Sequence, residues 1–108
     1  MLHCNMIAHP HPLQLGLEDL LGDLHHARRS LDLGRLAWLA YCEVRRWART
    51  AGEQALAEHS SALVTQAPHA SREKFLAEVD ELIVELEQAH SRVLTAAAAA
   101  DAADALQD

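Results

Sequence analysis

One segment near the end of the chain places its apolar residues at alternating steps of four and three. The residues of this stripe are Phe75, Val79, Leu82, Leu86, Ala89 and Val93. Such spacing keeps apolar side chains on one side of an α-helix, over about 30 Å at 1.5 Å per residue. Ser71 can cap the first turn and Glu73 suits its positive end, so we predict a helix beginning after Ser71. The stripe must be covered, either by other helices of a bundle or by a second chain.

The composition favours an all-α fold. Hydrophobic residues make up 50% of the 108 residues, most of them Ala and Leu, whereas β-branched and aromatic residues are scarce. Four Gly and three Pro leave few turns, which argues against an all-β fold. We therefore predict one domain, a small antiparallel bundle of three to four helices at residues 13–95. A flexible His-rich tail is expected at 1–12, and an Ala-rich helical extension or frayed tail at 96–108.

Turn and cap residues divide the bundle into segments. We predict a first helix from residue 13 or 17 to 29, a second over 33–51, a third over 53–65, and a loop at 66–70 before the last helix. Asp32 can cap the second helix, and Gly52 can close it in the left-handed conformation. Because residues 53–65 also favour helix, one long bent helix over 33–65 is the alternative.

The helix predicted over 33–51 is apolar on more than one side. At 100° per residue most of its apolar side chains share one wide face, and its arginines lie opposite. Trp38, Leu39 and Cys42 break this division, because they point among the arginines. This apolar patch must be covered either by the tail, the third helix or the last helix of the same chain, or by another protein molecule, including a second copy.

Trp and Arg are enriched at the energetically important centres of protein interfaces, and a charged rim commonly surrounds an apolar centre. We therefore predict a partner-binding site on the central helix. Its residues are Trp38, Leu39, Cys42, Arg35, Arg45, Arg46 and Arg49.

Charge is unevenly distributed along a chain whose formal net charge is −7. Residues 28–50 hold six arginines and two acids, about +4, whereas residues 73–108 hold two basic and nine acidic residues, about −7. We expect these two regions to attract each other. The overall acidity argues against general affinity for nucleic acid, although the arginine face keeps DNA binding as an alternative. Trp47 is expected to face the core, which argues against a recognition helix here.

Motifs for catalysis are absent from the sequence. It has no Gly-rich phosphate loop, no GxSxG elbow and no HExxH pair, so we predict no enzyme, no cofactor and no metal. The strongest metal candidate is the pair Glu87 and His90, but a di-iron bundle needs further ligands, and the second pair, Asp23 and His26, is expected to point outward. We expect His90 to be a partly buried, hydrogen-bonded histidine. His25 and His26 are expected to be solvated.

The first residues, MLHCNMIAHPHP, offer His3, Cys4, His9 and His11 as metal ligands, in no spacing typical of a folded site. Met6 is an alternative start. Cys4 and Cys42 form no CxxC motif, so we predict reduced thiols in a cytoplasmic protein. Neither a secretory signal nor a membrane-spanning run is readable.

These observations predict a cytoplasmic helical protein–protein interaction module that acts as an adaptor, a regulator or a chaperone-like protein, with a homodimer among its forms. The alternative is a DNA-associated transcriptional regulator that uses the arginine face of the central helix.

Overall fold

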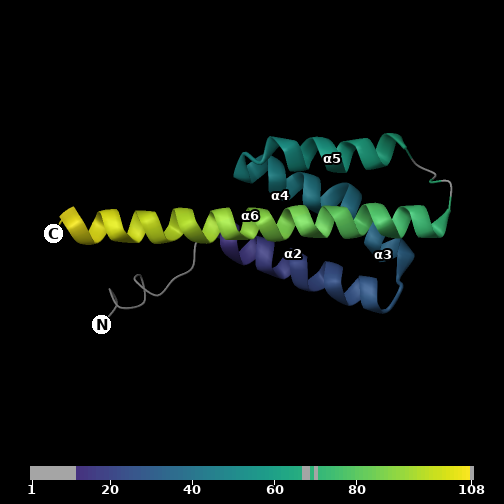
Figure 1. Ribbon diagram of the computed structural model, residues 1–108, viewed down its shortest axis with the longest axis horizontal. Coiled ribbons are helices and arrows are strands. Elements are labelled where there is room, and N and C mark those ends of the chain that lie inside the picture. Colours follow the sequence, from purple (N-terminus) through teal and green to yellow (C-terminus); the bar gives the residue numbers. More distant parts are fainter. Residues whose placement is uncertain (1–11, 67–68, 70, 108) are drawn as a thin grey trace.

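The computed structural model describes residues 12–66, 69 and 71–107, and this part of the chain is an all-α bundle. Its elements are α2 (Pro12–Arg29), α3 (Leu33–Trp38), the π-helical turn η1 (Leu39–Glu43), α4 (Val44–Ala51), α5 (Gln54–Thr65) and α6 (Arg72–Gln107). Helix α6 runs through the middle, with α2 along one side and the α4–α5 pair along the other (Figure 1). Because α6 runs antiparallel to both α2 and α5, the prediction of a small antiparallel helical bundle is confirmed.

The core forms where α2, the central helix and α5 meet the apolar stripe of α6. Within the stripe, Phe75, Val79, Leu82, Leu86 and Ala89 are buried and Val93 is partly buried. The bundle therefore covers the stripe within one chain, without needing a second. Leu31 is 45% exposed, because it lies in the turn after α2 with a φ of 53°.

The predicted caps set the ends of the helices. The Asp32 carboxylate accepts a hydrogen bond from the Arg35 amide at 3.2 Å, and the Ser71 hydroxyl accepts one from the Lys74 amide at 3.0 Å. Gly52 closes α4 with a φ of 75°, so α4 and α5 are separate helices and the single long helix is wrong. Helix α2 begins at Pro12, one residue inside the expected tail, and proline is favoured in a first turn because it lacks an N–H group.

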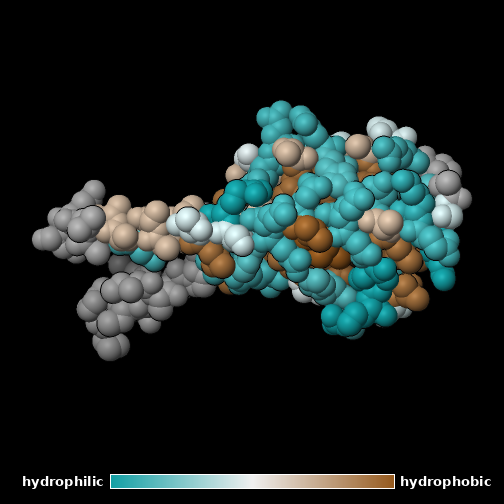
Figure 2. Space-filling view, in the orientation of Figure 1, coloured by the Kyte–Doolittle hydropathy of each residue, from teal (hydrophilic) through white to brown (hydrophobic). Residues whose placement is uncertain are grey.

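The predicted tail, loop and Ala-rich extension can be compared with the structure only over the described residues. The tail predicted at 1–12 lies, except for Pro12, outside the described residues, as do residues 67, 68 and 70 of the predicted loop. Helix α6 continues to Gln107, and its Ala-rich end projects beyond the other helices (Figure 2). Residues 98–104 are exposed along this projection.

The central helix contains a π-helical turn that the sequence analysis did not predict. The Val44 amide donates to the Leu39 carbonyl, five residues back, whereas a regular α-helix would use the Ala40 carbonyl. The hydroxyl of Ser60, a fully buried residue of α5, donates to the Ala40 carbonyl instead. The wider turn is therefore stabilised by a side chain from the neighbouring helix.

This turn changes which side of the central helix faces the core. One extra residue in a turn rotates everything after it backward by about 100°, the angle of one residue. That rotation aligns Leu36, Ala40, Val44 and Ala48, each spaced by four residues and each 0% exposed. The buried face then extends to Leu39, which is 3% exposed, so its predicted position among the arginines is wrong.

Ion pairs tie the outer helices to α6. Arg28 of α2 binds Asp80 at 2.8 Å, and Arg92 binds Glu53, between α4 and α5, at 2.8 Å. The hydrogen bonds that the guanidinium groups donate to these carboxylates raise the pKa of each arginine. Among the described residues, Arg28 is the only arginine of 28–50 that forms an ion pair with α6, so the expected attraction between the two regions is realised at one arginine.

We expect Ser60→Ala to destabilise the protein by about 1–3 kcal/mol, because the Ala40 carbonyl would be left buried without its donor. Ser61→Ala is the matched control, since Ser61 is partly exposed and its hydroxyl has no hydrogen bond within the described part of the chain. Its cost should stay within about 0.5 kcal/mol. Urea unfolding followed by circular dichroism measures both, and equal losses would contradict the role assigned to Ser60.

Candidate functional site

The end of α3 and the outer side of α4 form a surface around Trp38. Trp38 is 55% exposed, the largest exposure among the big apolar side chains of the described residues. It borders a shallow hollow of about 440 Å³. We call this hollow the Trp38–arginine surface, and its residues are Trp38, Cys42, Glu43, Arg45, Arg46, Arg49 and Thr50.

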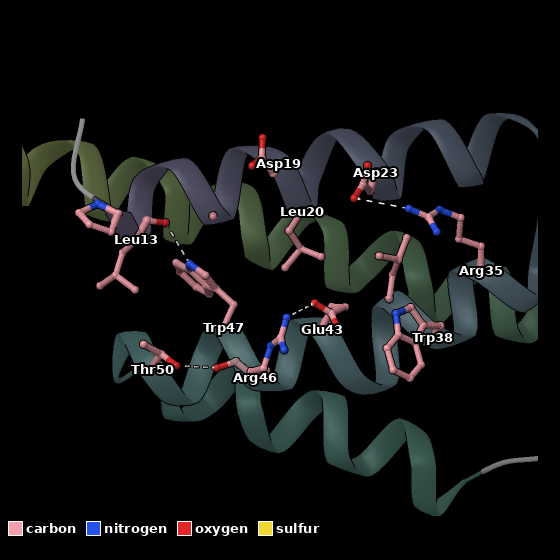
Figure 3. A pocket seen from close by; sticks show the side chains of 13 residues that line it. Leu13, Asp19, Leu20, Asp23, Arg35, Trp38, Glu43, Arg46, Trp47 and Thr50 are labelled. Atoms are coloured by element: carbon pink, nitrogen blue, oxygen red, sulfur yellow. Dashed lines mark hydrogen bonds and ion pairs between the residues drawn. The ribbon is translucent and has the colours of Figure 1, made fainter. Parts of the chain in front are cut away.

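A groove of about 620 Å³ adjoins this surface and separates α2 from the central helix. Figure 3 shows Asp19 and Asp23 on the α2 side, with Trp38 and Arg46 across from them. Apolar residues of the groove include Leu20, Leu39 and Trp47. The groove and the Trp38–arginine surface share four residues, so they form one continuous surface; these are Trp38, Glu43, Arg46 and Thr50.

The arginines of this region differ in their partners. Arg35 reaches across the groove to Asp23 at 3.6 Å, and Arg46 binds Glu43 on its own helix at 2.7 Å (Figure 3). Arg45 and Arg49 form no ion pair with any residue of 12–66, 69 or 71–107. The positive charge of the Trp38–arginine surface is therefore left incompletely neutralised by this chain.

The structure brings most of the predicted partner-binding residues together. Trp38, Cys42, Arg45, Arg46 and Arg49 line the Trp38–arginine surface, and Arg35 lies in the adjoining groove. Leu39 also lines this groove, but it is only 3% exposed and packs mainly in the core. Neither α5 nor α6 covers Trp38, since more than half of the residue stays exposed. The alternative prediction, that the N-terminal tail covers Trp38, involves residues outside the described part of the chain.

The opposite side of the same helix holds Tyr41, whose ring meets Phe75 edge-on with centroids 6.3 Å apart. Its hydroxyl lies 3.1 Å from Nε2 of His69. Burial raises the pKa of Tyr41, so its hydroxyl stays protonated at neutral pH. This side of the helix is packed, in contrast to the side that carries Trp38.

The sequence candidates for a metal site, Glu87 and His90, form hydrogen bonds to residues of α2. Nε2 of His90 lies 2.9 Å from Glu18, and Glu87 lies 3.2 Å from His25, so each of the two candidate residues faces α2. The hydrogen bond from His90 lowers the pKa of Glu18. His90 is partly buried and hydrogen-bonded, as predicted, whereas His25 is bonded rather than simply solvated.

The remaining candidates do not complete that site. Asp23 pairs with Arg35, and His26 is exposed. His3, Cys4, His9 and His11 lie outside the described residues.

Sequence reasoning missed another group of ionisable side chains, between α5 and α6. His59 stands beside Glu78 and Glu81, with one ligand atom of each residue within 4.8 Å of the others. The spacing of the glutamates along α6 was readable in the sequence. The position of His59 was not, because it depends on how α5 packs against α6.

None of the helices in the described part of the chain combines the length and the hydropathy of a membrane-spanning segment. Comparisons with models of protein families, with curated proteins and with solved structures gave no match.

We expect the two tryptophans to respond differently to substitution. Trp47 is 9% exposed and its indole N–H donates to the Leu13 carbonyl at 3.0 Å, so Trp47→Ala should cost about 3–5 kcal/mol of stability. Trp38→Ala should cost less than about 1 kcal/mol, because much of its ring is already in water. Urea unfolding measures both costs. A loss at Trp38 as large as that at Trp47 would show that Trp38 is covered in solution.

Proposed function

We propose that this chain is a non-enzymatic protein–protein interaction module whose Trp38–arginine surface binds an acidic segment of another protein. The observation that carries the proposal is the exposure of Trp38 beside Arg45 and Arg49, which find no acid in the described part of the chain. A partner can bury the exposed apolar side chain and place carboxylates beside the unpaired arginines at the same time.

Covering Trp38 supplies part of the binding energy. A tryptophan can bury up to about 250 Å². If a partner covers roughly 100 Å² of the exposed ring, the gain is roughly 2.5 kcal/mol at 25 cal/mol per Å². The adjoining groove continues the apolar contact with Leu20 and Trp47. A helical or extended segment with one large apolar side chain fits this combination.

The need for acidic residues beside Arg45 and Arg49 distinguishes between the possible partners. Residues 1–11 contain no Asp or Glu, so they cannot neutralise Arg45 and Arg49. The acidic end of α6 offers Asp101 and Asp104 to a second copy, but Leu106 is the one large apolar residue beside them, and the other apolar neighbours are alanines. An acidic segment of a different protein supplies both contacts.

Nucleic acid is disfavoured by the groove itself. Two of its acids, Asp23 and Glu43, already pair with the groove's arginines, and Asp19 adds a negative charge that repels phosphates. The net charge of −7 adds to this repulsion. The arginines are better matched to carboxylates that arrive with an apolar side chain than to a continuous phosphate backbone.

A photo-crosslinking experiment tests the proposal. The full chain carries p-benzoylphenylalanine in place of Thr50, an exposed residue that borders both the groove and the Trp38–arginine surface. After irradiation in an extract of the source cells, the crosslinked peptide is identified by mass spectrometry. We expect an acidic segment of another protein. A synthetic peptide of that segment should bind at least about tenfold more weakly to Arg45→Glu/Arg49→Glu, a difference of 1.4 kcal/mol.

Arg29→Glu/Arg72→Glu is the matched control, because both arginines are exposed and have no ion partner among the described residues, and the change in charge is the same. The control should bind the peptide like the unmodified chain. Crosslinks confined to residues 1–11, to a second copy or to nucleic acid would each overturn the proposal. Equal weakening in the control would also overturn it, as would the absence of any crosslink.

A further inference from the structure

A histidine of α5 is surrounded by carboxylates of α6, away from the Trp38–arginine surface. Nδ1 of His59 lies 2.6 Å from Oε2 of Glu85, and Nε2 lies 3.9 Å from Oε2 of Glu78. Glu81 completes the group, and one ligand atom each of His59, Glu78 and Glu81 lies within 4.8 Å of the others. Three carboxylates therefore converge on one imidazole.

Glu78, Glu81 and Glu85 follow steps of three and four along α6, which places them on one side of the helix. Contacts between α5 and α6 bring His59 to that side. The side chains of Glu78 and His59 are 16% and 20% exposed, the lowest values among the ion-paired side chains of the described residues. Two of the potential ligands are thus held at a packed helix–helix contact.

The hydrogen bond to Glu85 gives the imidazole a defined orientation. A proton on Nδ1 that is donated to Glu85 leaves the lone pair of Nε2 free on the side of Glu78. Histidines that bind metal ions commonly donate their other ring N–H to a carboxylate in this way, which fixes the tautomer and the ring orientation. Glu85 is therefore placed as a positioning residue.

The set of donor atoms selects the kind of ion. Imidazole nitrogen and carboxylate oxygen are both zinc ligands, and a site with three protein ligands keeps a fourth position for water. Calcium and magnesium prefer sites made of oxygen atoms alone. We propose that His59, Glu78 and Glu81 bind a zinc ion that links α5 to α6, with Glu85 orienting His59.

The ligand atoms of His59, Glu78 and Glu81 must move slightly closer together to bind a zinc ion. Ligand atoms of a tetrahedral zinc ion lie about 3.3 Å apart, as follows from bonds of about 2.0 Å. Rotation of the two glutamate side chains can bring the atoms from their present spread of up to 4.8 Å to this separation. Lys74 approaches Oε1 of Glu78 at 3.5 Å, whereas His59 faces Oε2, so one oxygen of Glu78 remains directed toward the site.

Two other histidines provide an internal comparison. His90 has Glu18 as its ion-pair partner and His25 has Glu87, one carboxylate each among the described residues. A histidine paired with one acid is sufficient for a simple contact between helices. His59 has more carboxylates around it than such a contact needs, and this excess distinguishes a potential ion site from the other two pairs.

Zinc binding is tested with the full chain in which the tail ligands are removed by His3→Ala, Cys4→Ser, His9→Ala and His11→Ala. Isothermal titration calorimetry with Zn²⁺ measures affinity and stoichiometry, and Co²⁺ absorption reports the ligand geometry. We expect one Zn²⁺ per chain and a rise in Tm of about 5 °C or more at saturating zinc. His59→Ala should remove binding, and the exposed substitution Glu81→Gln, which removes a ligand, should weaken it by more than the roughly 10–100-fold typical of losing a residue that only orients a ligand.

His90→Ala is the matched control, because it removes an interhelical histidine that has one carboxylate partner. It should leave zinc affinity and stoichiometry unchanged. Circular dichroism of each variant verifies that the bundle still forms. Absence of zinc binding by the chain without tail ligands would overturn the proposal, as would binding unaffected by both His59→Ala and Glu81→Gln. Equal losses in the His90 control would overturn it too.

Discussion

The hydrogen bond from the Ser60 hydroxyl to the Ala40 carbonyl determines how the central helix faces its neighbours. A π-helical turn is normally costly because its hydrogen-bond pattern displaces a carbonyl from its regular partner. With Ser60 as donor, the turn at Leu39–Glu43 is retained inside the bundle. Leu39 then packs inward, Trp47 reaches the Leu13 carbonyl, and Trp38 stays on the outside. The turn thus accounts for the burial of Leu39, whereas Trp38 lies on the outer side already expected from regular helical spacing.

Helix α6 organises the charges of the molecule as well as its core. Carboxylates of this helix meet His25, Arg28 and His59, so much of its acidity is used in contacts between helices. The arginines of α4 lie on the outer side of their helix, away from those carboxylates. Positive charge therefore remains on one surface of a protein whose net charge is −7. This separation supports the proposal of an acidic partner, since the carboxylates of α6 that pair with other helices do so away from the Trp38–arginine surface.

Periodicity and caps were sufficient to predict the helices. The stripe of α6 and the capping residues Asp32, Gly52 and Ser71 are signals contained within short segments of the sequence. The π-helical turn was missed, although the steps of four from Leu36 to Ala48 carried a signal, since a regular α-helix drifts by 40° over each such step. Assuming 100° per residue throughout put Leu39 on the wrong side. The ion pairs of Glu87 and His90 with α2 depended on packing between distant segments, as did the glutamates around His59. No local pattern in the sequence contains that information.

The account rests on the bond from the Val44 amide to the Leu39 carbonyl, because this bond defines the wider turn. Scalar couplings across hydrogen bonds, measured by NMR on uniformly ¹⁵N,¹³C-labelled protein, identify the acceptor of each amide directly. We expect a coupling between the Val44 nitrogen and the Leu39 carbonyl carbon, and none from Val44 to the Ala40 carbonyl carbon. A coupling from Val44 to Ala40 would show a regular α-helix there. It would contradict both the role of Ser60 and the account of why Leu39 is buried.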